Sequence, residues 1–255
     1  MAYFNYRSKN IYYTETGKGK TVVFLHGNTA SSKMFEPLLP LYEEYFKVIL
    51  VDFLGHGKSE RLTEFPADLW QEEARQTIAL LEHLNCKKVS LVGSSGGAWA
   101  AVNAGLLRPD LVEKVVADSF DGRTLGEDFA RKLIDERASA KQDEQAAWFY
   151  QWCQGEDWER IVDMDTKALI QCAEERLPLF FKPISELKVP LLLMGSVRDE
   201  MVRSDILAEF EAISGKTGAG ICMFSDGGHP AILSNAEQAA EAIREFVSRD
   251  DTKND

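Results

Sequence analysis

Two glycines frame one serine at the end of a predicted strand, and this frame constrains the fold more than any other feature of the chain. Gly93 and Gly97 lie two residues before and two residues after Ser95, directly behind the apolar run Val89–Ser94. A turn from strand to helix at this point is so sharp that the two framing positions nearly collide. Glycine has no Cβ atom and therefore fits at both. Because helical sequence follows over Gly96–Leu107, the motif predicts a strand–turn–helix that presents Ser95 as a nucleophile.

The neighbouring serine does not fit this frame, because Ser94 would have Val92 two residues before it. A serine hydroxyl is a weak nucleophile at neutral pH. It needs a histidine to accept its proton and a carboxylate to orient the imidazole. Of the four histidines, His229 alone comes late enough for the chain order serine, acid, histidine. We therefore predict that His229 is the base.

The carboxylate of this predicted triad is assigned to Asp199, which follows the apolar strand Leu191–Gly195. Catalytic groups of open parallel sheets gather at the carboxyl ends of the strands, so the position suits the role. Asp118 and Asp121 follow the preceding predicted strand and are the rival acids.

Two backbone N–H groups are needed to stabilise the negative charge of a tetrahedral intermediate. One should come from Gly96, which follows the nucleophile at a helix N-terminus, where the dipole also favours negative charge. The other should come from the loop after strand Val22–His26, with Asn28 as the candidate because Gly27 permits a close approach. Thr29, the next residue of this loop, is predicted to bind the substrate.

Strands and helices alternate along the chain, which predicts an α/β fold. The strands are continuous apolar runs, as expected for a parallel sheet covered by helices on both faces. The predicted strands are Tyr3–Arg7, Ile11–Thr16, Val22–His26, Val48–Asp52, Val89–Ser94, Val112–Asp118, Leu191–Gly195 and Ile221–Phe224. The predicted helices are one near Lys33–Tyr45, then Ala67–Leu84, Gly96–Leu107, Asp205–Ile213 and Ala236–Val247.

The alternation is interrupted over residues 120–189, where the composition is helical and no clear strand is found. We predict that this segment is an inserted helical cap, and that residues 1–119 and 190–255 form the core. The segment carries much of the aromatic content of the chain. Trp148 and Trp152 are predicted to bind the substrate as part of an apolar pocket wall.

The composition argues against several classes of function. The net charge of −12 is unfavourable for a nucleic-acid partner. No run is long and apolar enough to span a membrane, and the first residues lack the apolar core of a signal peptide. The four cysteines are scattered, which indicates free thiols in a reducing compartment and no metal site. We expect a cytoplasmic protein with a polar, frayed tail from Arg249 to Asp255.

Together these motifs resemble the α/β-hydrolases of the capped, single-domain kind. The resemblance covers nearly the whole chain in the family's order, and it implies an eight-stranded, mostly parallel sheet with an antiparallel second strand. Nothing in it requires a metal or an organic cofactor. Leu54 departs from the pattern, because many relatives have Arg at this position before the His-Gly turn. The matching segments are His26-Gly27-Asn28, Asp52 to Ser59, Gly93 to Gly97, Gly195 to Asp199 and Gly228-His229.

Within the family, Phe65–Asp68 and Lys87–Leu91 resemble the valacyclovir hydrolase (biphenyl hydrolase-like) branch. That branch places an acidic residue directly after the nucleophile, which suits an amino-ester substrate. Gly96 occupies this position here, so the resemblance carries over the fold and the ester chemistry but not the amino-ester preference.

The leading hypothesis is a serine hydrolase, carboxylesterase-like and of class EC 3.1.1, that cleaves a small carboxylic ester, thioester or lactone through an acyl-enzyme. A second hypothesis keeps the triad but changes the bond, as in carbon–carbon bond hydrolases and cofactor-free perhydrolases. A third is a hydrolase-fold sensor that binds a small ligand and signals to a protein partner. We expect a monomer or homodimer whose partner is a small ester-like molecule, not nucleic acid or a membrane.

Overall fold

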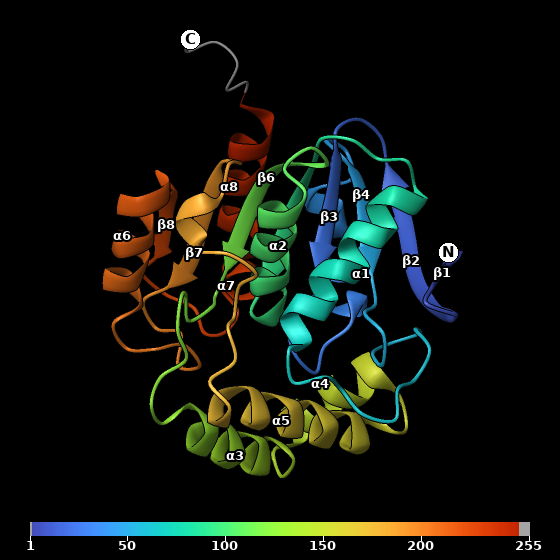
Figure 1. Ribbon diagram of the computed structural model, residues 1–255, viewed down its shortest axis with the longest axis vertical. Helices are drawn as coiled ribbons and strands as arrows, with labels where there is room; N and C mark the ends of the chain where they lie inside the picture. Colours follow the sequence, from blue (N-terminus) through green and yellow to red (C-terminus); the bar gives the residue numbers. More distant parts are fainter. Residues whose placement is uncertain (1, 250–255) are drawn as a thin grey trace.

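The computed structural model describes residues 2–249 and contains a sheet of eight strands in the order β1-β2-β4-β3-β5-β6-β7-β8 (Figure 1). Strand β2 is antiparallel to both of its neighbours, and the other neighbouring pairs are parallel. The predicted α/β-hydrolase architecture is thereby confirmed, the antiparallel second strand included. The strands are β1 Ala2–Tyr6, β2 Lys9–Gly17, β3 Thr21–Leu25, β4 Lys47–Val51, β5 Val89–Ser94, β6 Val112–Asp118, β7 Leu191–Ser196 and β8 Gly220–Phe224.

Helices lie close to where the apolar periodicity predicts them, with two differences. The segment near Lys33–Tyr45 forms a 3-10 helix, because Pro37 and Pro40 cannot donate the hydrogen bonds of an α-helix. A short helix after His229 has no counterpart in the prediction. The helices are α1 Leu69–His83, α2 Gly96–Leu107, α3 Phe129–Ala140, α4 Glu144–Gln154, α5 Trp158–Glu174, α6 Ile206–Thr217, α7 Ala231–Ser234 and α8 Ala236–Ser248, and the 3-10 helices are η1 Ser32–Leu41 and η2 Ile184–Glu186.

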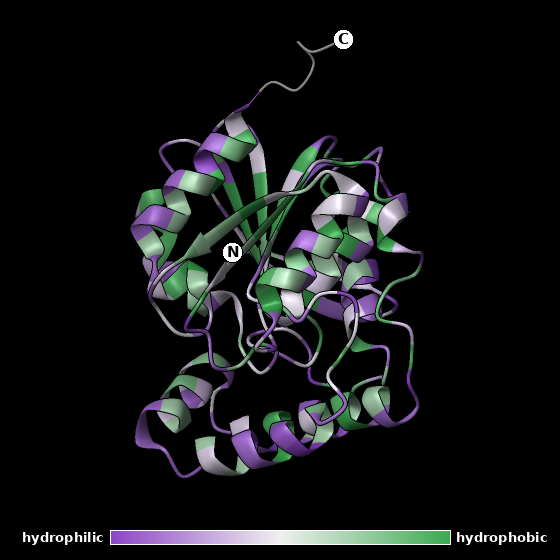
Figure 2. Cartoon of the chain, turned by 90° about the vertical axis from the view of Figure 1, so that its left-hand side faces the viewer, coloured by the Kyte–Doolittle hydropathy of each residue, from purple (hydrophilic) through white to green (hydrophobic). Residues whose placement is uncertain are grey.

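The sheet is covered on both faces, because successive side chains of a strand point to opposite sides. In β3, Val23 and Leu25 belong to the apolar cluster that includes α1 and α2. Val22 and Phe24 belong to a second cluster, formed with η1 and α8. Figure 2 shows the strands coloured mainly as hydrophobic, whereas the outer faces of the helices are mixed. The hydrophobic effect therefore fixes the helices on the sheet, and the strand ends are left to carry polar groups.

Three helices, α3, α4 and α5, lie between β6 and β7 in a segment that we call the helical insertion (residues 120–189). Asp143 begins α4 by accepting hydrogen bonds from the N–H groups of Gln145 and Ala146. Figure 1 shows the three helices together below the sheet, at the edge toward which the parallel strands point. That this segment acts as a substrate-selecting cap stays a prediction.

Two further sequence predictions concern membrane-spanning segments and the C-terminal tail. Across residues 2–249, no helix is long and apolar enough to cross a membrane. Residues 250–255, which include most of the tail predicted to be frayed, lie outside the described part of the chain.

Candidate active site

The turn between β5 and α2 has the geometry that the glycine frame predicts. Ser95 has a φ angle of 53°, in the left-handed region that residues other than glycine rarely adopt. A Cβ atom on Gly93 would lie 2.1 Å from the carbonyl oxygen of Gly97. A Cβ on Gly97 would lie 2.2 Å from the carbonyl oxygen of Leu25. Both positions therefore exclude any side chain, and the strained serine lies at the carboxyl edge of the sheet.

His229 bridges the serine and a carboxylate. The hydroxyl of Ser95 lies 2.9 Å from His229 Nε2, close enough to donate a hydrogen bond to it. On the other side of the ring, His229 Nδ1 donates to Asp199, with 2.9 Å to Oδ2 and 3.1 Å to Oδ1. Because a carboxylate only accepts, this contact places the proton on Nδ1 and leaves Nε2 free to accept from the serine. The structure thus brings together the three residues predicted as a triad.

Asp199 is kept ionised by its surroundings. Burial alone would raise the pKa of this carboxyl, but the hydrogen bonds from His229 and from the N–H of Met201 outweigh that effect. The pKa of Asp199 therefore lies below its ordinary value. Its side chain has no exposed area, while that of His229 remains 12% exposed. An ionised, buried carboxylate can both orient the imidazole and stabilise its protonated form.

The two rival acids make different contacts. Asp118 is buried and accepts hydrogen bonds from the Ser94 hydroxyl at 3.0 Å and from the N–H of Ile232 at 3.3 Å. Burial raises its pKa to about 7. Asp121 accepts from the N–H of Arg203 at 2.7 Å. Neither makes a hydrogen bond to a histidine within residues 2–249, so the geometry favours Asp199.

The loop after β3 approaches the serine closely, as the oxyanion prediction requires. A Cβ on Gly27 would lie only 3.0 Å from the Cβ of Ser95. Gly96 is the first residue of α2, where backbone N–H groups have no partner within the helix. A Cβ on Gly96 would fall 2.0 Å from Asn28 Oδ1, so the space just after the nucleophile is already filled. This crowding is a physical reason why no acidic side chain follows the nucleophile here.

Asn28 and Thr29 contact charged groups that the motif analysis missed. Asn28 Nδ2 donates to Asp165 Oδ2 at 2.7 Å. Arg137 donates to Thr29 Oγ1 at 3.2 Å and to the Tyr150 hydroxyl at 2.8 Å, and it lies 3.4 Å from Asp165 Oδ1. Burial raises the pKa of Asp165, and Arg137 and the Asn28 amide oppose this only in part. Arg137, Tyr150 and Asp165 thus form a buried polar cluster between the insertion and the loop after β3.

A signal for this cluster was present in the sequence. Asp165 occupies the buried face of α5, at helical spacing from Ile161, Val162, Ala168 and Leu169. A charged residue on an otherwise apolar stripe must find a partner, because an unpaired buried charge is costly. Asp165 is therefore recognisable in the sequence as the charged residue at an otherwise apolar position of the helical pattern of α5.

Trp148 and Trp152 both belong to α4. Their rings stack on each other at 5.5 Å, and 62% of Trp148 is exposed. Within residues 2–249, the other ring contacts of Trp152 are with Phe149 and Lys33. Their predicted role in binding the substrate is not supported by a contact with Ser95 or His229, and it stays a prediction.

The two histidines at strand ends have structural surroundings. His26 donates from Nδ1 to the carbonyl oxygen of Gly27 and accepts from the N–H of Phe53 at Nε2. Burial lowers its pKa, which keeps the ring neutral and in one tautomer. His56 is fully buried and stacks on Phe65, and burial lowers its pKa as well. Neither ring contacts Ser95.

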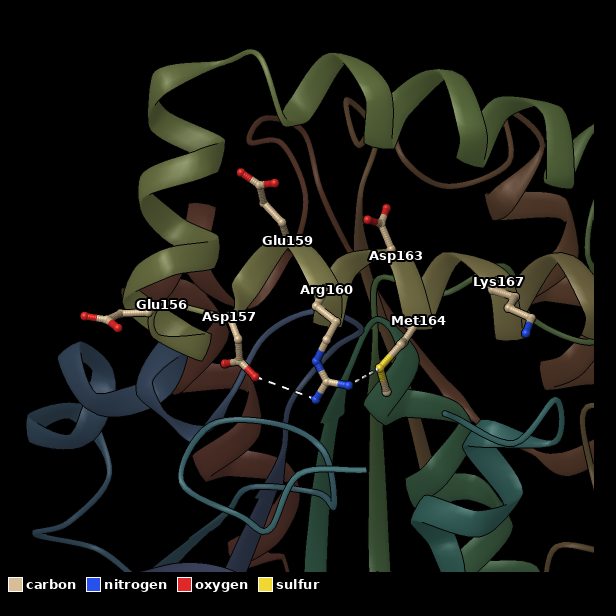
Figure 3. A pocket seen from close by; sticks show the side chains of 7 residues that line it. All are labelled: Glu156, Asp157, Glu159, Arg160, Asp163, Met164 and Lys167. Carbon is tan, nitrogen blue, oxygen red and sulfur yellow. Dashed lines mark hydrogen bonds and ion pairs between the residues drawn. The ribbon is translucent and has the colours of Figure 1, made fainter. Parts of the chain in front are cut away.

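One surface cavity is lined by residues other than those of the triad. A surface cavity of about 680 Å³ lies along α5 (Figure 3), where Arg160 extends between Asp157 and Met164. No group of three or more His, Cys, Asp or Glu side chains in the described chain is arranged to hold a metal ion. The cavity is lined by Glu156, Asp157, Glu159, Arg160, Asp163, Met164 and Lys167.

Comparison with known proteins shows the family. The profile described as "Alpha/beta hydrolase family" matches residues 22–242, so the chain belongs to the α/β-hydrolase family. It is 34% identical over 110 residues to the human protein named "Serine hydrolase BPHL", covering 42% of this chain and 38% of that protein. This similarity supports the predicted resemblance to the biphenyl hydrolase-like branch.

Other relatives align over more of the chain at lower identity. An Escherichia coli (strain E24377A) 2-hydroxy-6-oxononadienedioate/2-hydroxy-6-oxononatrienedioate hydrolase is 25% identical, covering 95% of this chain and 92% of that one. The crystal structure of a serine hydrolase involved in carbazole degradation has a TM-score of 0.76 at 23% identity, with 97% and 98% of the two chains covered. That structural likeness shows the fold alone.

The first curated relatives match only in part. The aligned segments span 40%, 37% and 49% of the lengths of the first three, which are hydrolases from Bacillus subtilis, Mesorhizobium japonicum and Acinetobacter baylyi. The matches therefore span less than half the length of these relatives, and the activity and substrate of the chain belong to the proposals below.

Proposed function

We propose that this hydrolase cleaves a small carboxylic ester, thioester or lactone through an acyl-enzyme, with Ser95, His229 and Asp199 as its triad. The observation that carries the proposal is the continuous hydrogen-bonded chain from the serine through the imidazole to the carboxylate. Two further observations support the proposal: the strained φ angle of Ser95 at the end of β5, and the close approach of Gly27 in the loop after β3. These are the parts that acyl transfer needs.

The geometry supports the following steps. Ser95 Oγ attacks the substrate carbonyl carbon while its proton passes to His229 Nε2, and Asp199 stabilises the resulting imidazolium. The carbonyl oxygen becomes negative and accepts hydrogen bonds from the N–H groups of Gly96 and Asn28. His229 then protonates the leaving alcohol or thiol, which leaves the acyl group on Ser95. A water molecule, deprotonated by His229, attacks this acyl group and releases the acid.

Carbon–carbon bond hydrolysis is the second candidate. Relatives that align over most of the chain are named as hydrolases of 2-hydroxy-6-oxo dienoic acids. Compounds of that kind contain no ester, so their hydrolysis must break a carbon–carbon bond. The same three residues could serve this reaction, and the choice depends on the substrate that the insertion admits.

The proposal also covers the helical insertion and the state of the protein in the cell. We infer that the helical insertion acts as the cap, because its helices lie over the strand ends that carry the triad. Its buried polar cluster above the loop favours a small substrate with polar groups near the reacting carbon. A cytoplasmic monomer or homodimer remains part of the proposal, and the four free thiols are compatible with a reducing compartment.

Labelling with a fluorophosphonate, followed by a panel of p-nitrophenyl esters and a 2-hydroxy-6-oxo dienoic acid, tests the proposal. Ser95→Ala should abolish labelling and lower turnover by ~10⁴-fold or more, because triad members act as a unit. Ser94→Ala is the matched control, since Ser94 is buried and donates to Asp118, and it should cost far less. Labelling that persists in Ser95→Ala would contradict the assignment. Tight ligand retention with negligible turnover of every probe would favour the sensor hypothesis.

A further inference from the structure

The side chain of Asn28 is fixed at both of its polar ends. Its Nδ2 donates to Asp165 Oδ2 of α5 at 2.7 Å, and its Oδ1 accepts from Trp70 Nε1 of α1 at 3.0 Å. Asp165 has no exposed side-chain area, and Trp70 is also buried. The amide of Asn28 therefore connects the helical insertion to a helix that packs beside the nucleophile.

This amide also lies against the start of α2. A Cβ on Gly96 would fall 2.0 Å from Asn28 Oδ1, which leaves no free space between them. The backbone N–H groups of these two residues are the proposed oxyanion donors. A displacement of the Asn28 side chain would therefore move its own N–H relative to Gly96 and Ser95.

Each of the three helices of the insertion contributes at least one polar group to this loop. Thr29 has a φ angle of 58°, which a β-branched residue adopts only where its surroundings impose it. Arg137 of α3 donates to Thr29 Oγ1 at 3.2 Å, and Gln154 of α4 donates to the Thr29 carbonyl oxygen at 2.9 Å. Asp165 of α5 supplies the third contact, through Asn28. The loop conformation therefore depends on groups that lie more than 100 positions away in the chain.

Arg137 places a positive charge beside Asp165. A lone carboxylate so close to the oxyanion would oppose the negative charge that develops during the reaction. The guanidinium of Arg137 lies 3.4 Å from Asp165 Oδ1, and both side chains are buried. Arg137 therefore offsets the negative charge of Asp165 while Asp165 accepts the Asn28 hydrogen bond, and it also pairs with Glu136 Oε2 at 3.4 Å.

We propose that Asp165 is a positioning residue for the oxyanion hole, and that it acts through the side chain of Asn28 to hold the backbone N–H of that residue in place. The inference rests on the proposed serine-hydrolase function and adds a role for the insertion besides substrate selection. An oxyanion donor stabilises the transition state far more than the bound substrate. Losing the alignment of one donor should therefore lower kcat and leave KM nearly unchanged.

The test measures kcat and KM for p-nitrophenyl acetate, together with the rate constant for fluorophosphonate inactivation. Asp165→Ala should lower kcat and the inactivation rate constant by roughly 10- to 100-fold, somewhat less than the loss of a whole oxyanion donor. KM should stay within about threefold. Asp165→Asn can still accept from the Asn28 amide, so it should recover part of the loss. This recovery would not be expected if the residue only filled space.

Asp163→Asn is the matched control. Asp163 lies on the same helix, is mostly exposed and pairs with Lys141 at the end of α3. Asp163→Asn therefore also removes a carboxylate that links α5 to the end of α3, but this carboxylate has no contact with Asn28 or its partners. We expect kcat to change by less than about twofold. A loss equal to that of Asp165→Ala would show that any weakening of the insertion slows the reaction, and it would overturn the specific role of Asp165.

A double-mutant cycle with Asn28→Ala examines the link itself. If Asp165 acts through Asn28, Asp165→Ala should have little further effect on kcat in the Asn28→Ala background. Independent, multiplying effects would overturn the proposal. If Asp165→Ala does not fold, the same cycle is measured with Asp165→Asn. Its effect on kcat should then be lost in the Asn28→Ala background. Failure of the proposed function is recognised separately, because the wild-type protein would then show neither labelling nor turnover.

Discussion

The carboxyl edge of the sheet and the helical insertion meet at one loop, but they place their polar groups in different ways. At the sheet edge, Ser95, Asp199 and His229 each follow a strand end, so the parallel pairing of strands brings them together. In the insertion, Arg137 lies in the last turn of α3 and Asp165 in the middle of α5, and only the packing of α3 against α5 makes them neighbours. Topology positions the first group, and packing positions the second.

The two regions also differ in what the loss of one group should do. His229 retains some exposure, so water can reach it after a neighbouring group is removed. Arg137 and Asp165 are buried, and removing one partner leaves an uncompensated charge that costs about 3–5 kcal/mol. Changes to the triad side chains at the sheet edge should therefore affect the chemistry with little effect on stability. Changes in the insertion should affect both.

The largest expected effect concerns the acid at the sheet edge. Asp199→Asn should lower turnover of p-nitrophenyl acetate by ~10⁴-fold, because the amide would favour the wrong tautomer of His229. Its melting temperature should stay close to that of the wild type. Asp118→Asn and Asp121→Asn, assayed beside it, should retain most of the activity, since neither carboxylate bonds to His229. A collapse of activity in one of these two variants, with near-normal turnover in Asp199→Asn, would place the acid after β6.

The second prediction examines the glycine frame. Gly97→Ala would bring a Cβ to 2.2 Å from the Leu25 carbonyl oxygen and 2.7 Å from that of His26, both backbone atoms that cannot move independently. We expect a loss of about 3 kcal/mol or more in the free energy of unfolding, measured with urea. Gly215→Ala is the control, because a Cβ on Gly215, in the last turn of α6, would meet no neighbouring atom within 4 Å. It should stabilise the fold by about 0.5–1 kcal/mol. Equal stability of the two variants would contradict the tight elbow.

The contrast between the two regions also explains which parts of the structure can be predicted from the sequence. The strands and the helices on the sheet follow from alternating periodicities, and the contacts among Ser95, Asp199 and His229 follow from motif spacing and chain order. The contact of Asn28 with Asp165 spans 137 positions and depends on the angle at which α5 crosses the loop. No periodicity encodes that angle. The 3-10 geometry of η1 was predictable in principle from Pro37 and Pro40, which a helical pattern alone does not weigh.

The third prediction concerns a buried acid of the sheet edge that makes no contact with the imidazole. Burial raises the pKa of Asp118 to about 7, whereas in the unfolded chain it titrates near 3.9. Between about pH 4 and pH 7 the folded state therefore holds a proton that the unfolded state has lost. The free energy of unfolding should fall as pH rises through this window, by at most about 1.4 kcal/mol per pH unit from this group.

Asp118→Asn removes that titration. The stability of the variant relative to the wild type should therefore increase from pH 4 to pH 7 and level off above pH 7. Urea denaturation at several pH values measures the difference. Asp121→Asn provides a comparison, since burial also raises the pKa of Asp121. A difference between Asp118→Asn and the wild type that is constant across this range would contradict the raised pKa.

The smallest expected effect concerns the stacked pair Trp148 and Trp152 of α4. The aromatic content of the segment predicts that these residues select the acyl chain, and one methylene in such a pocket is worth only about 1–3 kcal/mol. Trp148 is 62% exposed, so Trp148→Ala should change the preference between acetate, butyrate and hexanoate esters less than Trp152→Ala. Tyr3→Ala, at an exposed aromatic residue of β1, is the control and should leave the preference unchanged. An identical profile in both single variants and the double variant would assign the tryptophan stack to the surface of the insertion, leaving selection to the polar cluster above Asn28.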